Sequence, residues 1–431
     1  MDVTRSEESG RSSWRWATPW TSTHVGRAPA PPRRRCDPTP SPRRGKGAVP
    51  AVIPKTCKIE SFFGEWEFAV EYVACASDVD GLTLREVLDL ADPETLALWE
   101  GLELGYTETT GHPLLREAIA DEYTKTDADG ITVCGGGAVE ALFLVSHALI
   151  GPGDHAVVIW PAFEPLHRIV PALGAEFTPV PLDAENGWRL DLDAVRRAIR
   201  PTTRALFINF PHNPTGALPS RAEFEALVAL GAEAGVTVVS DEVYRHLEFE
   251  PGATLPAAAD LDENAVSVGV MSKAYALAGL RVGWMATRNT ALTTAARTLK
   301  DYTTVCASAP AEILSLIALR ARDQLVERSK RIILDNLGHA DSFFGKHPDA
   351  FAWEPPRAGM VAFPKLTLPT PAHEFVSDLV REESVLLLPD SVFDTTDNRF
   401  RIGLGRTSLP LALDRMDTFL TRRARHGRSQ R

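Results

Sequence analysis

Short apolar segments alternate with helical patterns from residue 131 onward, and this alternation restricts the fold more than any other feature of the chain. Candidate strands lie at 131–135, 155–160, 176–182, 204–210, 236–242, 265–270 and 281–286. Helical patterns such as 137–149 and 221–234 separate most of them. Continuously apolar strands separated by helices are typical of a mostly parallel sheet covered on both faces. We therefore predict an α/β domain that binds its ligands beyond the carboxyl ends of the strands.

The flanking segments predict further parts of the chain. A helical region at 309–345 leads to a smaller α+β unit with candidate strands at 360–366, 385–388 and 399–404. We expect four parts: a basic tail at 1–58, an N-terminal arm with a helix of the small domain at 59–95, the large domain at 96–310, and the interdomain helix with the C-terminal small domain at 311–431.

Charge is distributed unevenly between the tail and the rest of the chain. Residues 1–58 hold twelve Lys or Arg and four acidic residues, which leaves 34 basic and 53 acidic residues, a net charge of −19, for the remainder. The tail is rich in Arg, Pro and Ser and lacks an apolar period, so we expect it to be disordered. A nucleic-acid arm, a transit signal and a non-essential tail all remain open for it. The acidic body argues against nucleic acid as the main partner.

Other features indicate the compartment. No apolar run reaches the roughly 18–20 residues of a membrane span, and residues 1–58 lack the apolar region of a secretory signal. The five cysteines are scattered without C-x-x-C spacing, which argues against a disulfide framework and a zinc site. We expect a cytoplasmic protein with no membrane partner and no metal.

One lysine, Lys273, lies just after the candidate strand 265–270, and Arg281 follows eight residues later. A loop at a strand end is a usual place for a functional residue. A lysine in apolar surroundings loses stabilisation of its charged form, and the neutral amine can attack a carbonyl to form a Schiff base. On this stretch alone, an ordinary surface lysine is the favoured interpretation.

Two other strands end in unusual residues. Strand 204–210 runs into a turn containing Asn213 and Pro214, where a cis peptide can hold the Asn213 amide toward a ligand or simply connect two elements. Strand 236–242 brings Asp241 out of a buried segment, with Tyr244 close behind. A buried carboxylate needs a partner, which is either a structural salt bridge or helix cap, or a protonated pyridine nitrogen.

A glycine-rich turn, Gly135 to Gly137, joins strand 131–135 to a helix that starts near Ala138 and Val139. Free N–H groups at such a helix start bind phosphate. The turn lacks the GxGxxG and Walker patterns, which argues against a dinucleotide or a nucleoside triphosphate. An amine, an acid, a phenol, an amide, an arginine and a phosphate cradle at neighbouring strand ends together suit pyridoxal phosphate.

With NPTG, SDEVY and SKAYALAGLRVGW in this order, the sequence resembles the class I/II aminotransferases over roughly residues 100–425. These are fold-type I pyridoxal-phosphate enzymes. The resemblance implies a large α/β domain with a mostly parallel seven-stranded sheet covered by helices, a smaller α+β domain, pyridoxal 5'-phosphate as cofactor, and a homodimer with shared active sites.

The resemblance also implies roles for individual residues around the cofactor ring. Lys273 resembles the lysine that forms the Schiff base and then moves the α-proton as base and acid. Asp241 resembles the acid that keeps the pyridine nitrogen protonated. Tyr244 and Asn213 are similar to the pair that hydrogen-bonds the ring 3'-oxygen, and Phe163 is in the position of the aromatic residue that stacks on the ring.

Around the phosphate, the resemblance implies a site formed by Arg281 and by the turn at Gly137, Ala138 and Val139. The family commonly has a hydroxyl residue where this chain has Val270, and often one at Ala138, which leaves Ser272 as the nearby hydroxyl.

Two further residues matched by the resemblance concern the partner subunit and the substrate. Tyr106 matches a tyrosine that reaches the phosphate of the neighbouring subunit. Arg401 resembles the arginine that binds the substrate α-carboxylate beside Asn213. Arg399 and Arg406 are nearby alternatives to Arg401.

The segments that usually line the substrate pocket differ from the family pattern. FFGEWEF and ACASDVDGL replace the familiar G-x-P segment, and Asp390 replaces a usual glycine. The resemblance therefore does not imply which amino acid is bound. It implies a transaminase that moves an amino group from an α-amino acid to a 2-oxo acid; the alternatives are a lyase, cyclase or oxidase of an amino acid, or a cofactor-binding regulator.

Overall fold

The computed structural model describes residues 54–429, all within the compact unit Val52–Arg431. Only residues 54–58 of the predicted basic tail fall in this range. The expectation of disorder for residues 1–53 lies outside the described residues. None of the helices between residues 54 and 429 is both long enough and apolar enough to cross a bilayer.

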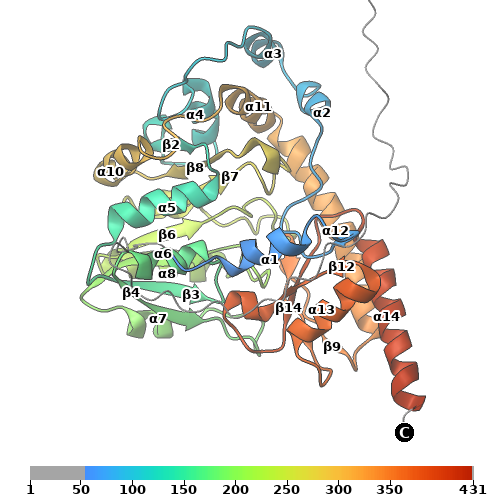
Figure 1. Cartoon of the computed structure of the whole chain (residues 1–431). Coiled ribbons are helices and arrows are strands. Elements are labelled where there is room, and N and C mark those ends of the chain that lie inside the picture. Colours follow the sequence, from blue (N-terminus) through green and yellow to red (C-terminus); the bar gives the residue numbers. More distant parts are fainter. Residues whose placement is uncertain (1–53, 430–431) are drawn as a thin grey trace, which may run out of the picture. The chain divides into compact units, whose positions relative to one another are not determined.

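The seven candidate strands form one sheet with the order β2-β8-β7-β6-β5-β3-β4 (Figure 1). Their bounds are β2 Ile131–Cys134, β3 His155–Trp160, β4 Glu176–Pro181, β5 Thr203–Asn209, β6 Thr237–Asp241, β7 Val266–Val270 and β8 Gly283–Ala286. β8 runs antiparallel to both of its neighbours, whereas the other neighbouring strands pair in parallel. The predicted α/β fold with a mostly parallel sheet is confirmed.

Helices cover both faces of the sheet because side chains along each strand alternate between two apolar layers. Val158, Phe207 and Val239 pack with α5 and α10, whereas Val157, Leu206 and Val238 pack with α7 and α8. The helices of this region are α4 Pro113–Ala120, α5 Ala138–Leu149, α6 Pro165–Ala172, α7 Leu192–Ala198, α8 Arg221–Glu233, α9 Ala258–Leu261 and α10 Thr290–Lys300. The parallel neighbours β5 and β6 end in the polar residues Asn209 and Asp241, which lie side by side at one edge of the sheet.

The C-terminal region differs in detail from the predicted pattern. The helical region 309–345 is two helices, α11 Ala309–Arg320 and α12 Arg322–Lys346, interrupted at Ala321. Candidate strand 360–366 is broken at Phe363 and Pro364, so its two pieces pair with different partners. The elements here are β9 Phe351–Ala352, β10 Val361–Ala362, β11 Lys365–Leu366, α13 Ala372–Glu383, β12 Val385–Leu386, β13 Leu388–Pro389, β14 Phe400–Gly403 and α14 Leu409–Ser429.

The N-terminal segment packs onto this C-terminal region. It contains α1 Lys58–Trp66, β1 Tyr72–Val73, α2 Leu84–Leu88 and α3 Pro93–Glu100. β1 pairs in parallel with β12, and the Gly403 N–H in β14 donates to the Ala74 carbonyl at 2.8 Å. In Figure 1, α1 in blue lies between the sheet and the red C-terminal elements.

This contact depends on the absence of a side chain at Gly403. A Cβ there would lie 1.9 Å from the Ala76 carbonyl oxygen. We predict that Gly403→Ala lowers the free energy of unfolding by about 1–3 kcal/mol, as overpacking against backbone does, measured by urea denaturation. Gly338→Ala is the matched control, because nothing lies within 4 Å of its Cβ position on α12. Equal stability of the two variants would contradict the close contact.

Candidate active site

A cavity of about 370 Å³ lies where the carboxyl ends of the strands meet the N-terminal segment and β14. Ten of the twelve predicted site residues line it: Ala138, Val139, Phe163, Asn213, Asp241, Tyr244, Ser272, Lys273, Arg281 and Arg401. Gly137 borders it, since a Cβ at this position would lie 3.1 Å from Nη2 of Arg281. Tyr106 lies elsewhere on this chain and is 94% exposed.

Lys273 follows β7 on a turn, and its amine points into the cavity. Nζ donates a hydrogen bond to Ser77 Oγ at 3.1 Å and lies 5.8 Å from the centre of the Tyr244 ring. Burial lowers the pKa of this amine to about 8, opposed by the nearby Asp78 carboxylate. A substantial neutral fraction is therefore present near neutral pH, so the amine is a competent nucleophile and base.

Asp241 ends β6 and is 3% exposed. Within residues 54–425 its carboxylate has no ion pair, and the one hydrogen bond found for it comes from the Val243 N–H at 3.4 Å. Burial raises the pKa of Asp241 to about 7, opposed by that hydrogen bond and by the charge on Lys273. The carboxylate thus lines the cavity without the structural salt bridge that the sequence left open.

Asn213 and Tyr244 present two hydrogen-bonding groups beside these residues. The Asn213–Pro214 peptide is cis, as predicted. Asn213 is held by its backbone N–H, which donates to Asn209 Oδ1 at 2.8 Å, and by its Oδ1, which accepts from Arg401 at 3.0 Å. Its Nδ2 remains a donor for a ligand. The Tyr244 hydroxyl donates weakly to the Ser77 carbonyl at 3.4 Å.

The three candidate arginines of the C-terminal region have different surroundings. Arg401 on β14 is 1% exposed, lines the cavity, and donates to Asn213 and to the Cys75 carbonyl. Arg399 instead stacks 4.6 Å from the Trp188 ring, and Arg406 pairs with both oxygens of Asp78. Arg401 is therefore the one of these three that can meet a ligand in the cavity.

An anion cradle lies at the start of α5. Gly137 has a φ of 77°, a conformation that favours glycine, and it gives the helix no side-chain cap, so N–H groups at Ala138 and Val139 are left for an anion. Arg281 has left-handed backbone geometry, φ 56°, which ends the preceding turn, so β8 begins two residues later than predicted. Its guanidinium donates to the Gly136 carbonyl at 3.3 Å. Val270 lines the cavity, so no hydroxyl is supplied there.

The wall of the cavity opposite the strand ends was not predicted from the sequence. Ile59, Glu60, Phe63 and Glu67 from α1 and its C-terminal cap line the cavity, as do Ala76, Ser77 and Asp78. All of these residues except Ile59 and Glu60 belong to the two segments that depart from the family pattern. Their polar character was visible, but their position depends on contacts more than 300 residues away in sequence, between Ala74 or Cys75 and β14.

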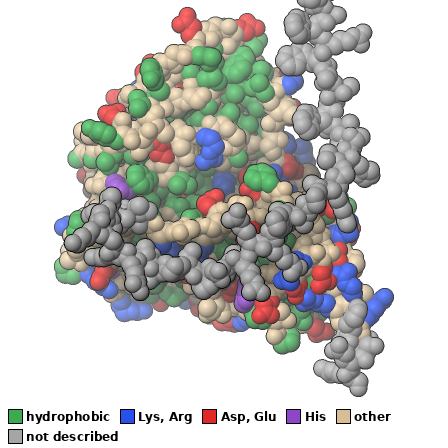
Figure 2. Space-filling model, viewed as in Figure 1, with side chains coloured by type: hydrophobic (Ala, Val, Ile, Leu, Met, Phe, Trp, Pro, Cys, Tyr) green, Lys and Arg blue, Asp and Glu red, His purple; other side chains and the backbone are tan. Residues whose placement is uncertain are grey.

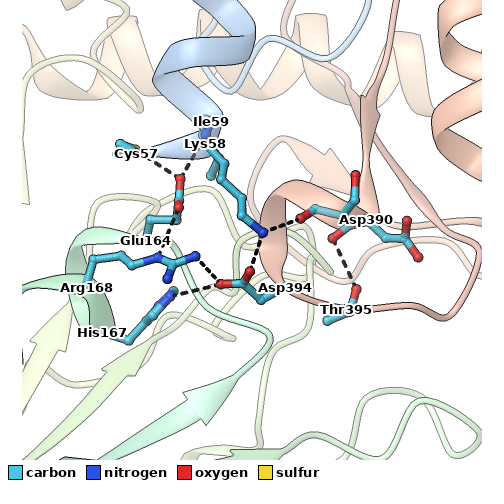
Figure 3. A network of polar contacts seen from close by, with 10 residues as sticks. Cys57, Lys58, Ile59, Glu164, His167, Arg168, Asp390, Asp394 and Thr395 are labelled. Atoms are coloured by element: carbon cyan, nitrogen blue, oxygen red, sulfur yellow. Dashed lines mark hydrogen bonds and ion pairs between the residues drawn. The ribbon is translucent and has the colours of Figure 1, made fainter. Parts of the chain in front are cut away.

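A polar network fixes this wall to the rest of the molecule (Figure 3). Glu164, fully buried before α6, accepts from the Ile59 N–H at 2.8 Å and from the Cys57 thiol at 3.0 Å. Arg168 bridges Glu164 to Asp394, which follows the 3-10 turn Asp390–Phe393, and Lys58 binds the same Asp394. The start of α1 is thus anchored both to the large-sheet region and to the C-terminal region.

Comparison with known proteins agrees with this geometry. The family described as aminotransferase class I and II matches residues 75–410. Capreomycidine synthase of Streptomyces vinaceus is 31% identical over 359 residues, 83% of this chain and 91% of that protein. A PLP-dependent aminotransferase from Streptococcus suis superposes with a TM-score of 0.80 and 31% identity, over 85% of this chain and 98% of the other. The PLP-dependent cyclase OrfR superposes with a TM-score of 0.78 and 27% identity, over 89% of this chain and 100% of the other.

Because the family match spans most of the chain and the solved relatives share its fold, the protein belongs to the class I and II aminotransferases, and its cofactor is pyridoxal 5'-phosphate (PLP).

Proposed function

We propose that the cavity binds PLP and that the enzyme transfers an amino group from an α-amino acid to a 2-oxo acid. The observation that carries this proposal is the convergence of Lys273, Asp241 and Arg401 on one cavity beside a helix N-terminus. These supply an amine, a carboxylate and a guanidinium, the three groups that the reaction needs from the protein.

The residues present fit the cofactor. Asp241 is a buried carboxylate with no ion pair in the described chain, and a protonated ring nitrogen is the partner that would offset its desolvation. The uncapped start of α5 and Arg281 would hold the phosphate, with Ser272 as a further donor. Phe163 would cover one face of the ring, and Nδ2 of Asn213 and the Tyr244 hydroxyl would donate to the ring oxygen.

When bound, PLP supplies an aldehyde that condenses with amines and a ring that accepts electron density from the substrate α-carbon. Lys273 would provide the amine that anchors the cofactor and then carry the proton at the α-carbon, because its lowered pKa lets it release and accept a proton near neutral pH. Arg401 would hold the α-carboxylate, oriented by its hydrogen bond to Asn213.

Cyclisation of an amino acid is the second candidate. It is favoured by the likeness to capreomycidine synthase, which extends over 91% of that protein, and to a solved cyclase. The same three residues serve both reactions, since both begin with proton removal at the α-carbon. The two differ in whether the amino group leaves with an acceptor.

We also propose a homodimer, with Tyr106 reaching the cofactor phosphate of the other subunit. Tyr106 is 94% exposed, Leu104 beside it in sequence is 86% exposed, and Tyr302 is exposed to 86%. Figure 2 shows hydrophobic side chains gathered on the upper part of the visible face, where Figure 1 labels α3, α4 and α11. Exposed apolar patches of this kind mark subunit interfaces.

Product analysis tests the proposed reaction. The enzyme is incubated with PLP, a panel of amino acids, and pyruvate or 2-oxoglutarate as acceptor. We expect one molecule of a new 2-oxo acid for each acceptor molecule that gains an amino group, measured by mass spectrometry. Lys273→Ala should lower the rate by about 10²–10⁴-fold or more, the usual contribution of a general base. Consumption of the amino acid without any acceptor, giving a cyclic or cleaved product, would favour the second candidate.

The pH dependence of stability tests the role of Asp241 in the cofactor-free protein. Because the folded pKa is raised, the folded state keeps a proton between about pH 4 and 7 that the unfolded chain has released. Stability from this group is present at low pH and is lost as pH rises through 7. We compare the free energies of unfolding of Asp241→Asn and the wild type by urea denaturation. The variant's value relative to the wild type should rise by roughly 2–4 kcal/mol between pH 4 and pH 8. A difference that does not change with pH would refute the buried, unpaired carboxyl.

Substitution of Arg401 tests substrate binding. We expect Arg401→Leu to raise the KM for the amino acid by about 10–100-fold, the value of charged hydrogen bonds, while the dissociation constant of PLP changes by much less. Arg399→Leu is the comparison, since that guanidinium stacks on Trp188 and Arg399 does not line the cavity. Equal weakening of PLP and amino acid in Arg401→Leu would indicate a structural role.

A further inference from the structure

We propose that the substrate amino acid has a positively charged side chain, bound by Glu60 and Glu67 on the wall that α1 contributes to the cavity. This inference rests on the proposed function, because it names the substrate class of the same site.

The geometry of α1 places the two carboxylates together. Glu60, Phe63 and Glu67 are spaced i, i+3 and i+7, so they share one face of the helix, and all three line the cavity. Glu65, which is exposed like Glu60, lies outside that face and does not line the cavity. An aromatic ring between two carboxylates suits a cation on a flexible apolar stem, because the stem packs on the ring while the charged end reaches the oxygens.

The charges that line the cavity leave these two carboxylates without partners. Asp78 is paired with Arg406, and the proposed PLP and α-carboxylate would occupy Asp241, Arg281 and Arg401. Neither Glu60 nor Glu67 has a side-chain hydrogen bond or ion pair within residues 54–425. A bound amino acid therefore meets two carboxylates that make no hydrogen bond or ion pair with the described protein.

The position of Glu67 is unfavourable for an anion in the absence of a ligand. Glu67 is the C-terminal cap of α1, where the helix dipole favours cations. Burial, Asp78 and Glu60 raise the pKa of its carboxyl, opposed by the charge of Arg406. A bound cation would relieve each of these effects, whereas a side-chain carboxylate, as in aspartate or glutamate, would be repelled.

A second, independent feature shows that a ligand belongs in this cavity. Arg401 is 1% exposed and lines the cavity, and its Nε has no hydrogen-bond partner in the described structure. The wall facing it is held in place, because Glu164 binds the Ile59 N–H and Lys58 binds Asp394 (Figure 3). An α-carboxylate on Arg401 and a cation on the wall would thus be bound by two fixed groups.

Matched pairs of amino acids test the inference on the holoenzyme. L-Arginine against L-citrulline, and L-lysine against L-norleucine, differ mainly in side-chain charge. In calorimetric titrations without a 2-oxo acid, we expect the charged member of each pair to bind at least about tenfold more tightly, as hydrogen bonds between charged groups predict. The double variant Glu60→Gln/Glu67→Gln should reduce the ratio to about twofold or less, while Glu65→Gln should retain it.

The possible results separate this inference from the proposed reaction. Equal binding within the pairs, or a preference that survives in the double variant, overturns the inference. Charge-selective binding that disappears in the double variant supports it, even if product analysis finds no amino transfer and so contradicts transamination. Because both carboxylates lack partners, the double variant should keep its PLP content and its melting temperature, both of which are measured alongside.

Discussion

Asp241 and Lys273 line the same cavity, and the desolvation of these two groups is the constraint on which the site depends. Burial raises the pKa of the first to about 7 and lowers that of the second to about 8, so each loses stability in its charged form. Nothing in the fold requires this, since an apolar pair would pack more easily. In the proposed function, this desolvation is offset when the two groups meet a ring that carries both a cationic nitrogen and an aldehyde.

The cavity is closed by segments from opposite ends of the chain. Parallel strands deliver Asn213, Asp241 and Lys273 at one edge of the sheet, because every strand in that set points the same way. The residues that complete the site come from the N-terminal segment and from β14, joined by the hydrogen bond between Gly403 and Ala74 and by Arg401 with Cys75. Glu164 then ties α1 to both regions. The strand edge therefore supplies the groups that we propose to be reactive, whereas the N-terminal segment and β14 supply the opposite part of the cavity lining.

Sequence patterns predicted the sheet and the residues at its strand ends closely, because apolar period and turn chemistry are local. Asp241, Asn213 and Lys273 could be found where a buried strand meets a polar turn. Two kinds of feature could not be predicted. The resemblance favoured Arg401, but Arg399 and Arg406 could be set aside as alternatives only through their contacts with Trp188 and Asp78. The acidic wall of Glu60 and Glu67 was equally hidden, because its place in the cavity is set by long-range contacts and not by the pattern of its own helix.

Borohydride reduction of the PLP-loaded enzyme, followed by peptide mapping, tests the central claim most directly. Reduction makes the bond between the cofactor and its lysine permanent, so mass spectrometry identifies the residue. The account predicts that the label is found on the peptide containing Lys273, and that an amino acid added before reduction removes it from that peptide. A label on any other lysine, or one that persists at full yield in Lys273→Ala, would contradict the assignment of this cavity as the active site.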